Sequence, residues 1–128
     1  MREAEEKREF LRAEVNVFVN ENIASNAHLA RVVDISEGGM RYIKPAGPVE
    51  RCGPNVFLEF CLPDDELPVR ALGRVVGDDL ERSTHATSIC FTAIDSGDAD
   101  RIRRYVIRRK RAELFAMLRR DHAGAMSA

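Results

Sequence analysis

The sequence predicts a mainly β fold, a six-stranded antiparallel β-barrel followed by a long C-terminal α-helix. Six short apolar runs are separated by turns rich in Gly, Pro and Asp, and the last third of the chain changes to helical periodicity. The 128 residues, 45% of them hydrophobic, suffice for one core. We therefore expect a single domain over 1–128, with an N-terminal segment over 1–12, the barrel over 12–94 and the helix over 97–120.

The strand candidates combine β-branched or aromatic residues with turn signals at their ends. In the first, valines alternate with Asn and Phe from Val15 onward, which is typical of a strand with one buried face. Glu21-Asn22 supplies turn chemistry after it, and Gly77-Asp78-Asp79 closes the fifth run. The six runs are 15–19, 28–35, 40–43, 56–62, 69–76 and 85–94.

The C-terminal helix is expected to begin after Asp95-Ser96-Gly97-Asp98, because these side chains can cap a helix and acids suit its positive end. Apolar residues then recur at three- and four-residue steps, at Ile102, Tyr105, Val106, Leu114, Met117 and Leu118. A helix of roughly 35 Å exceeds what a small barrel covers. Part of it should project or meet another chain, for example in a homodimer.

The charge distribution is uneven along the chain. Residues 101–120 hold nine basic residues against one acid, Glu113, while the rest of the chain is acidic. This block could be a solvated helix face, a site of self-association or partner docking, or a surface for nucleic acid or an anionic membrane. Its only aromatic residues are Tyr105 and Phe115 and it carries no known DNA-binding motif, which argues against nucleic acid.

Several classes of protein are disfavoured by the sequence. Cys52, Cys61 and Cys90 form no C-x-x-C pair and do not cluster with histidines, so we expect neither a metal nor a disulfide framework. No phosphate loop or catalytic triad signature is present, so we expect no enzyme. No apolar run could span a membrane and no secretory signal opens the chain, so we expect a cytoplasmic protein.

Two short motifs could bind a nucleotide. Arg8 and Arg12 are four residues apart, and an arginine fork can pair with a phosphate or with the O6 and N7 edge of guanine. On its own this spacing equally describes a solvated charge cluster. Phe10, between them, could anchor the segment against the barrel.

The second motif is the turn Asp34-Ile35-Ser36-Glu37-Gly38-Gly39, between two strand candidates. The aspartate can accept hydrogen bonds from guanine, and the serine hydroxyl can donate to a phosphate. The glycines allow positive φ and let a ligand approach the backbone. An ordinary hairpin, in which Asp34 and Ser36 satisfy the turn backbone, is the alternative.

Together, R-x-x-x-R and D-x-S-x-x-G on this strand and helix pattern resemble the PilZ domain family, from about residue 7 to about residue 110. The resemblance implies a β-barrel receptor for cyclic di-GMP, with no other cofactor. It implies that Arg8 and Arg12 form a clamp over the ligand, that Asp34 and Ser36 contact guanine and phosphate, and that Gly38 and Gly39 keep the turn open.

The resemblance also carries two finer expectations. Lys7, directly before the first arginine, favours binding of a stacked pair of ligand molecules over a single one. Ser88 stands where late strands of the family often have glycine, which could change how the ligand packs.

The expected function is thus a cyclic di-GMP receptor whose N-terminal segment changes on binding and which signals to an unidentified downstream protein controlling motility, pili or exopolysaccharide. The alternative is a non-enzymatic interaction module that acts through its basic C-terminal helix.

Overall fold

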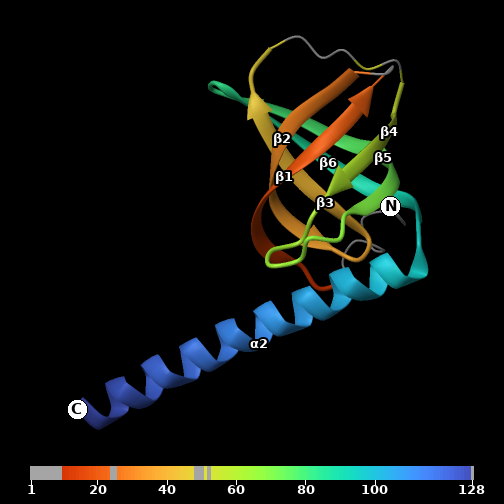
Figure 1. Cartoon of the computed structure of the whole chain (residues 1–128). Coiled ribbons are helices and arrows are strands. Elements are labelled where there is room, and N and C mark those ends of the chain that lie inside the picture. The colour runs from red at the N-terminus through yellow and green to blue at the C-terminus, as the bar shows by residue number, and fades with distance from the viewer. Residues whose placement is uncertain (1–9, 24–25, 48–50, 52, 128) are drawn as a thin grey trace.

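The structure, a computed structural model, describes residues 10–127 apart from 24–25, 48–50 and 52. Six antiparallel strands close into a barrel in the order β1-β2-β3-β6-β5-β4 (Figure 1). One helix, α2 (Ser96–Ser127), follows the last strand and runs past one end of the barrel. The strands are β1 (Ala13–Ile23), β2 (Asn26–Ser36), β3 (Gly39–Pro45), β4 (Asn55–Phe60), β5 (Val69–Glu81) and β6 (Thr84–Ile94). The predicted fold class is confirmed.

Alternating residues build the core, as β1 illustrates. Val15 and Val19 are buried while Phe18 is exposed, which confirms the predicted one-sided strand. A bulge between Glu14 and Val17 shifts the register toward β2. β1 pairs with β2 on one side and β4 on the other, so no edge of the sheet is left open.

Two predicted turns are wrong, because the strands run on through them. β1 continues to Ile23, which places the polar Glu21 on the inward face with no exposed surface. β5 continues through Gly77-Asp78-Asp79 to Glu81, still paired with β6. A register shift between Val75 and Gly77 absorbs the glycine, and partners on other strands satisfy the carboxylate of Asp78.

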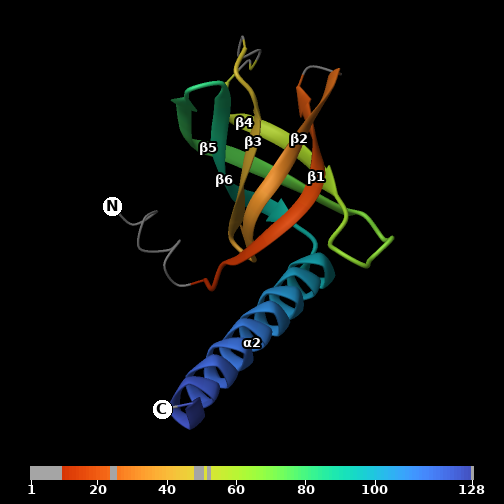
Figure 2. The same cartoon turned by 90° about the vertical axis from the view of Figure 1, so that its left-hand side faces the viewer.

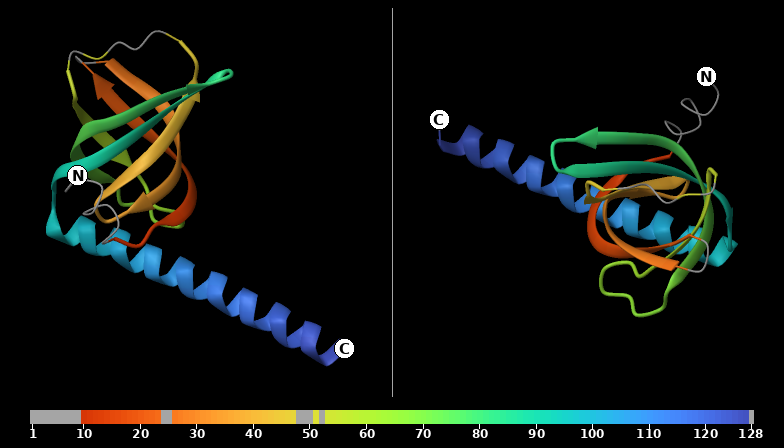
Figure 3. Two further views of the ribbon diagram at one scale, coloured as in Figure 1. Left: turned by 180° about the vertical axis from the view of Figure 1, so that it is seen from behind. Right: turned by 90° about the horizontal axis from the view of Figure 1, so that it is seen from above.

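The helix α2 covers the end of the barrel with its first turns (Figure 3). Ile102 and Val106 are buried and belong to the barrel core, and the Tyr105 hydroxyl donates to the Glu14 carbonyl at 3.1 Å. Asp95 caps the start, accepting from the Gly97 amide at 3.0 Å. The helix extends beyond the predicted end at residue 120 to Ser127, because no proline interrupts it.

The loop between β4 and β5 is attached to α2 by an arginine. Arg101 donates to Asp65 at 2.7 Å and also to the Leu67 carbonyl, and it pairs with Asp98 one helical turn earlier at 2.8 Å. These contacts join the β4–β5 loop to the first turns of α2.

Candidate functional site

The candidate site lies at the end of the barrel beside α2, where β2 ends, β3 begins and β6 ends (Figure 1). The register pairs Ser36 with Gly39 and Gly39 with Cys90, so the turn adjoins the end of β6. A pocket of about 400 Å³ lies here, within the usual range of small-molecule sites. Its lining comprises Phe10, Arg12, residues 36–38 and residues 89–94.

The two sequence motifs meet at this pocket. Arg12, just before β1, donates from Nη1 to Asp34 Oδ1 of β2 at 3.1 Å. Both side chains are about one third exposed, at 38% and 29%. An ion pair this accessible to water contributes about 0–1 kcal/mol, so either partner can exchange the other for a ligand group at little cost.

Ser36 holds the turn that forms one wall of the pocket. Its hydroxyl accepts from the Gly38 amide at 3.2 Å and donates to the Gly39 carbonyl at 3.4 Å. The residue is 2% exposed. Its hydroxyl is therefore hydrogen-bonded to the backbone of the turn, as in a hairpin whose serine satisfies the turn.

The two glycines are required by close contacts and not by backbone angles. Neither Gly38 nor Gly39 has positive φ, which corrects the prediction from the sequence. A Cβ on Gly39 would lie 2.0 Å from the Ile89 carbonyl oxygen, and one on Gly38 would lie 2.6 Å from the Phe10 ring. Gly39 thus lets β3 approach β6, and Gly38 lets Phe10 cover the turn.

Phe10 anchors the N-terminal segment, as predicted. Its ring lies on Gly38 and, with Leu11, borders a second small pocket that is also lined by Arg103, Val106 and Ile107 of α2. Residues 10–11 therefore lie beside both the turn and the helix. Lys7 and Arg8, the other predicted site residues, lie outside the described residues.

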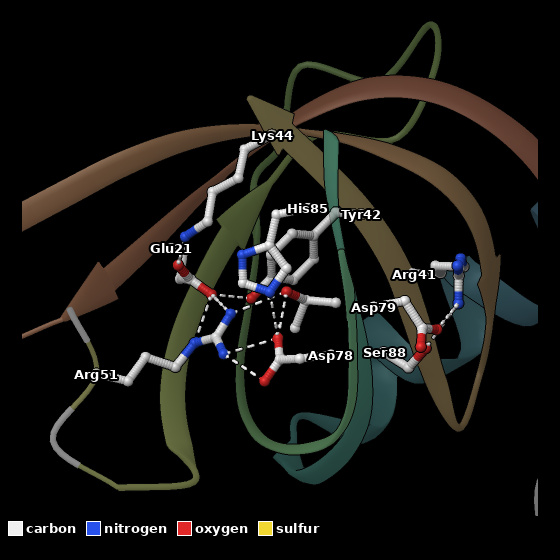
Figure 4. A network of polar contacts seen from close by, with 10 residues as sticks. Glu21, Arg41, Tyr42, Lys44, Arg51, Asp78, Asp79, His85 and Ser88 are labelled. Carbon is white, nitrogen blue, oxygen red and sulfur yellow. Dashed lines mark hydrogen bonds and ion pairs between the residues drawn. The ribbon is translucent and has the colours of Figure 1, made fainter. Parts of the chain in front are cut away.

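A neighbouring arginine was not predicted. Arg41 of β3 pairs in register with Asp34 on one side and Ser88 on the other. Its Nη1 donates to Ser88 Oγ at 3.3 Å and lies 3.7 Å from Asp79 Oδ2 (Figure 4). The sequence feature that could have pointed to Arg41 is its position two residues after Gly39, since residues two apart in a strand lie on the same face. Ser88 is thus an acceptor for Arg41.

A second polar cluster lies at the opposite end of the barrel (Figure 4). Glu21, without exposed surface, accepts hydrogen bonds from Tyr42, from Lys44 at 2.8 Å and from Arg51 at 3.2 Å. Arg51 also donates to both oxygens of Asp78 at 2.9 Å. Arg51 thereby holds the connection between β3 and β4 against the barrel.

The charges of this cluster compensate one another. Burial raises the pKa of Glu21, but hydrogen bonds from Lys44 and Tyr42 and the charge of Arg51 outweigh it, so the net pKa is lowered. Burial and the adjacent Glu21 carboxylate raise the pKa of Tyr42. Asp78 behaves like Glu21: burial raises its pKa, yet bonds from Arg51 and Thr87 lower it below the usual value. The polar groups of this cluster form their hydrogen bonds with one another, so we interpret the cluster as structural.

Two further kinds of feature are absent from the described part of the chain. Among residues 10–127, outside the gaps, no group of three or more His, Cys, Asp or Glu side chains could hold a metal ion. The same residues contain no helix that is long and apolar enough to cross a membrane.

Comparison with solved structures gives the same architecture. The chain superposes on the inhibitor of motility MotI/DgrA of Bacillus subtilis with a TM-score of 0.72 at 20% identity, covering 80% of this chain and 51% of that one. The PilZ domain of Escherichia coli YcgR with c-di-GMP matches with a TM-score of 0.69 at 15% identity, covering 84% and 94%. A longer structure of Escherichia coli YcgR in complex with c-di-GMP matches with a TM-score of 0.58 at 16% identity, covering 94% of this chain and 50% of that one.

The chain thus spans about half the length of MotI and of the longer YcgR, and nearly all of the isolated YcgR domain. No curated protein sequence matches it. The PilZ domain family model matches residues 6–108, which include both motifs and the whole barrel. The chain therefore belongs to the PilZ domain family.

Proposed function

We propose that this chain is a receptor for cyclic di-GMP, which it binds at the pocket beside α2. The ion pair between Arg12 and Asp34 carries the proposal, because it joins the two family motifs at one pocket. The guanidinium can pair with guanine O6 and N7 or with phosphate, and the carboxylate can accept from guanine N1–H and N2. Two solved neighbours of the same fold contain this ligand.

In this proposal the segment over 1–12 acts as a clamp on the barrel over 12–94. Arg12 exchanges Asp34 for the ligand, Arg8 joins it, and Gly38, Gly39 and Ser36 provide the rigid wall of the turn. Because Phe10 and Leu11 border the same small pocket as three residues of α2, we expect closure of the segment to reach the helix. A downstream protein would then recognise the closed segment. The similarity to an inhibitor of motility favours a partner in cytoplasmic control of movement.

Calorimetric titration of cyclic di-GMP into the purified chain tests the receptor proposal. We expect saturable binding, weakened about 10- to 100-fold by Arg12→Ala or Asp34→Ala, because each removes a hydrogen bond to a charged or polar ligand group. Arg70→Ala is the matched control, since Arg70 pairs with Glu59 on the outer face of β4 and β5. The proposal would be refuted if the unmutated chain gave no heat of binding at tens of micromolar ligand, a concentration far above the dissociation constant expected of a receptor.

The same titration tests the stoichiometry. We propose that Lys7 supports a stacked pair of ligand molecules, so the ratio should be near two per chain and should fall toward one in Lys7→Ala. A ratio of one in the unmutated chain would contradict this part while leaving the receptor function intact.

A further inference from the structure

The distal half of α2 extends away from the barrel (Figure 2). Ile102 and Val106 pack into the core, and the loop at Pro63 and Asp64 reaches along the helix as far as Ala112. The turns that follow carry apolar side chains which no part of the described barrel covers.

Four large apolar side chains lie close together on these turns. Leu114, Phe115, Met117 and Leu118 are 54%, 61%, 52% and 53% exposed. Leu114 and Leu118 are four residues apart and therefore neighbours on one face, with Met117 and Phe115 on either side. Exposed apolar clusters of this kind mark interaction surfaces.

Leu114, Phe115 and Leu118 point away from the side of α2 that packs on the barrel, whereas Met117, about 60° around the helix from Ile102, lies near that side. Leu118 follows Ile102 by sixteen residues, which at about 100° per residue places it roughly 160° around the helix from the side that packs on the barrel. Leu114, by the same count, is about 120° away. A flat surface can therefore reach these three side chains without meeting the barrel.

Basic residues border the apolar cluster at both ends. Arg108, Arg109, Lys110 and Arg111 precede it, and Arg119 and Arg120 follow it, against the single acid Glu113. Arg108 and Arg119 are eleven residues apart, about three turns, so they lie on the same side of the helix. These side chains are exposed, and their long stems allow the charge to lie beside an apolar surface.

We propose that residues 107–120 of α2 bind the surface of an anionic phospholipid bilayer. The helix would lie along the interface, with Leu114, Phe115, Met117 and Leu118 among the acyl chains and the arginines at the lipid phosphates. An apolar cluster with Lys and Arg on the neighbouring turns can lie at a membrane interface, where each basic residue adds electrostatic attraction to anionic lipid. The helix lies on the membrane and does not span it, in keeping with its many charges.

A second copy of the chain fits this surface less well. Pairing two such helices would bring six basic groups of one against six of the other. It would also bury only the four apolar side chains of each copy, a small surface for a stable interface, which needs roughly 1,000 Å². Nucleic acid would satisfy the charges but leave the four apolar side chains in water. An anionic bilayer satisfies both.

Cosedimentation of the full chain with vesicles tests the proposal. We expect binding to mixed phosphatidylglycerol and phosphatidylcholine vesicles, weakened by added salt, and little binding to pure phosphatidylcholine. Leu114→Gln with Leu118→Gln keeps helix propensity and should weaken binding by at least about tenfold, because two buried leucines supply much of the insertion free energy. Leu29→Gln with Leu80→Gln, at sites 61% and 71% exposed on the barrel, is the matched control.

A fluorescent reporter gives an independent readout. The chain contains no tryptophan, so Phe115→Trp introduces a single one, whose emission should shift to the blue on adding anionic vesicles. Absence of binding to anionic vesicles, or equal binding of the helix and barrel variants, would overturn the proposal. So would a concentration-dependent dimer, or a DNA complex, that is lost in the Leu114 and Leu118 variant while vesicle binding is retained.

Discussion

Gly39 of β3 lies so close to Ile89 of β6 that a methyl group on the glycine would fall 2.0 Å from the Ile89 carbonyl oxygen. The obstacle is backbone, which cannot rotate aside as a side chain can. The close approach of these two strands forms the floor of the pocket, since residues 36–38 line one wall and residues 89–94 the other.

We therefore expect Gly39→Ala to destabilise the protein by about 2–4 kcal/mol, because the two strands must separate to admit the methyl group. Gly47→Ala is the matched control, since nothing lies within 4 Å of a Cβ there. Urea unfolding followed by circular dichroism measures both. Equal stability of the two variants would show that the strands yield freely.

Gly38→Ala should act on the N-terminal segment more than on stability. The added methyl group meets the ring of Phe10, a side chain at the edge of the fold that can move away. We expect a loss of about 1 kcal/mol or less, with release of the segment from the turn. Proteolysis near residue 10 should become faster than in the unmutated chain, and Phe10→Ala should have the same effect. Unchanged protection in both variants would disprove the anchoring role of Phe10.

Glu21→Ala should be strongly destabilising. Removing the carboxylate leaves Lys44 and the Tyr42 hydroxyl without their acceptor inside the barrel and deprives Arg51 of one of its two carboxylate partners. Breaking a buried charge pair costs about 3–5 kcal/mol. Glu59→Ala is the control, because its partner Arg70 is 64% exposed and the pair contributes about 0–1 kcal/mol. Thermal or urea unfolding of the two variants gives the comparison. Similar losses would mean that the cluster is worth no more than a surface pair.

Stability should depend on pH through the same cluster. The pKa values of Glu21 and Asp78 are lowered in the folded state, so their contribution is present above the unfolded carboxyl pKa of about 4 and is lost as the pH falls below it through the folded values. The pKa of Tyr42 is raised, so its contribution is complete below about pH 10 and declines as the pH rises further.

Urea unfolding measured across the pH range tests both limbs. Tyr42→Phe removes the titrating group and should flatten the alkaline limb. The acid limb should persist, with the part from Glu21 reduced because the Tyr42 hydrogen bond helps to lower the Glu21 pKa. An alkaline limb of the same slope in this variant would assign that titration to other residues.

Much of the barrel could be predicted from the sequence. The alternating valines from Val15 predict a strand with one buried face, because every second side chain of an extended backbone points to the same side. The sequence places Gly38 and Gly39 in the second motif but does not show why glycine is needed there. Positive φ was the expectation, whereas contacts with Phe10 and Ile89 explain them, and these lie far away in the sequence.

Other features could not be predicted from local sequence patterns, because they depend on residues far away in the chain. Glu21 looked like part of a turn because an acid next to asparagine is usually solvated. Its burial depends on Lys44 and Arg51, which come from a later strand and a later loop. Likewise the Gly77-Asp78-Asp79 segment has turn chemistry, yet it is strand, because Arg51, Thr87 and His85 supply partners for Asp78.

The arginine motif shows the same division. The spacing of Arg8 and Arg12, and the turn from Asp34 to Gly39, were determined by the sequence alone, as were the barrel, the helix and its charge. Only the tertiary structure decided that Arg12 pairs with Asp34 beside a pocket walled by β6, and that the barrel leaves the apolar residues beyond Ala112 exposed. Local periodicity specifies which face of an element is apolar. Which face meets which partner depends on closure of the sheet and on the direction in which α2 leaves it.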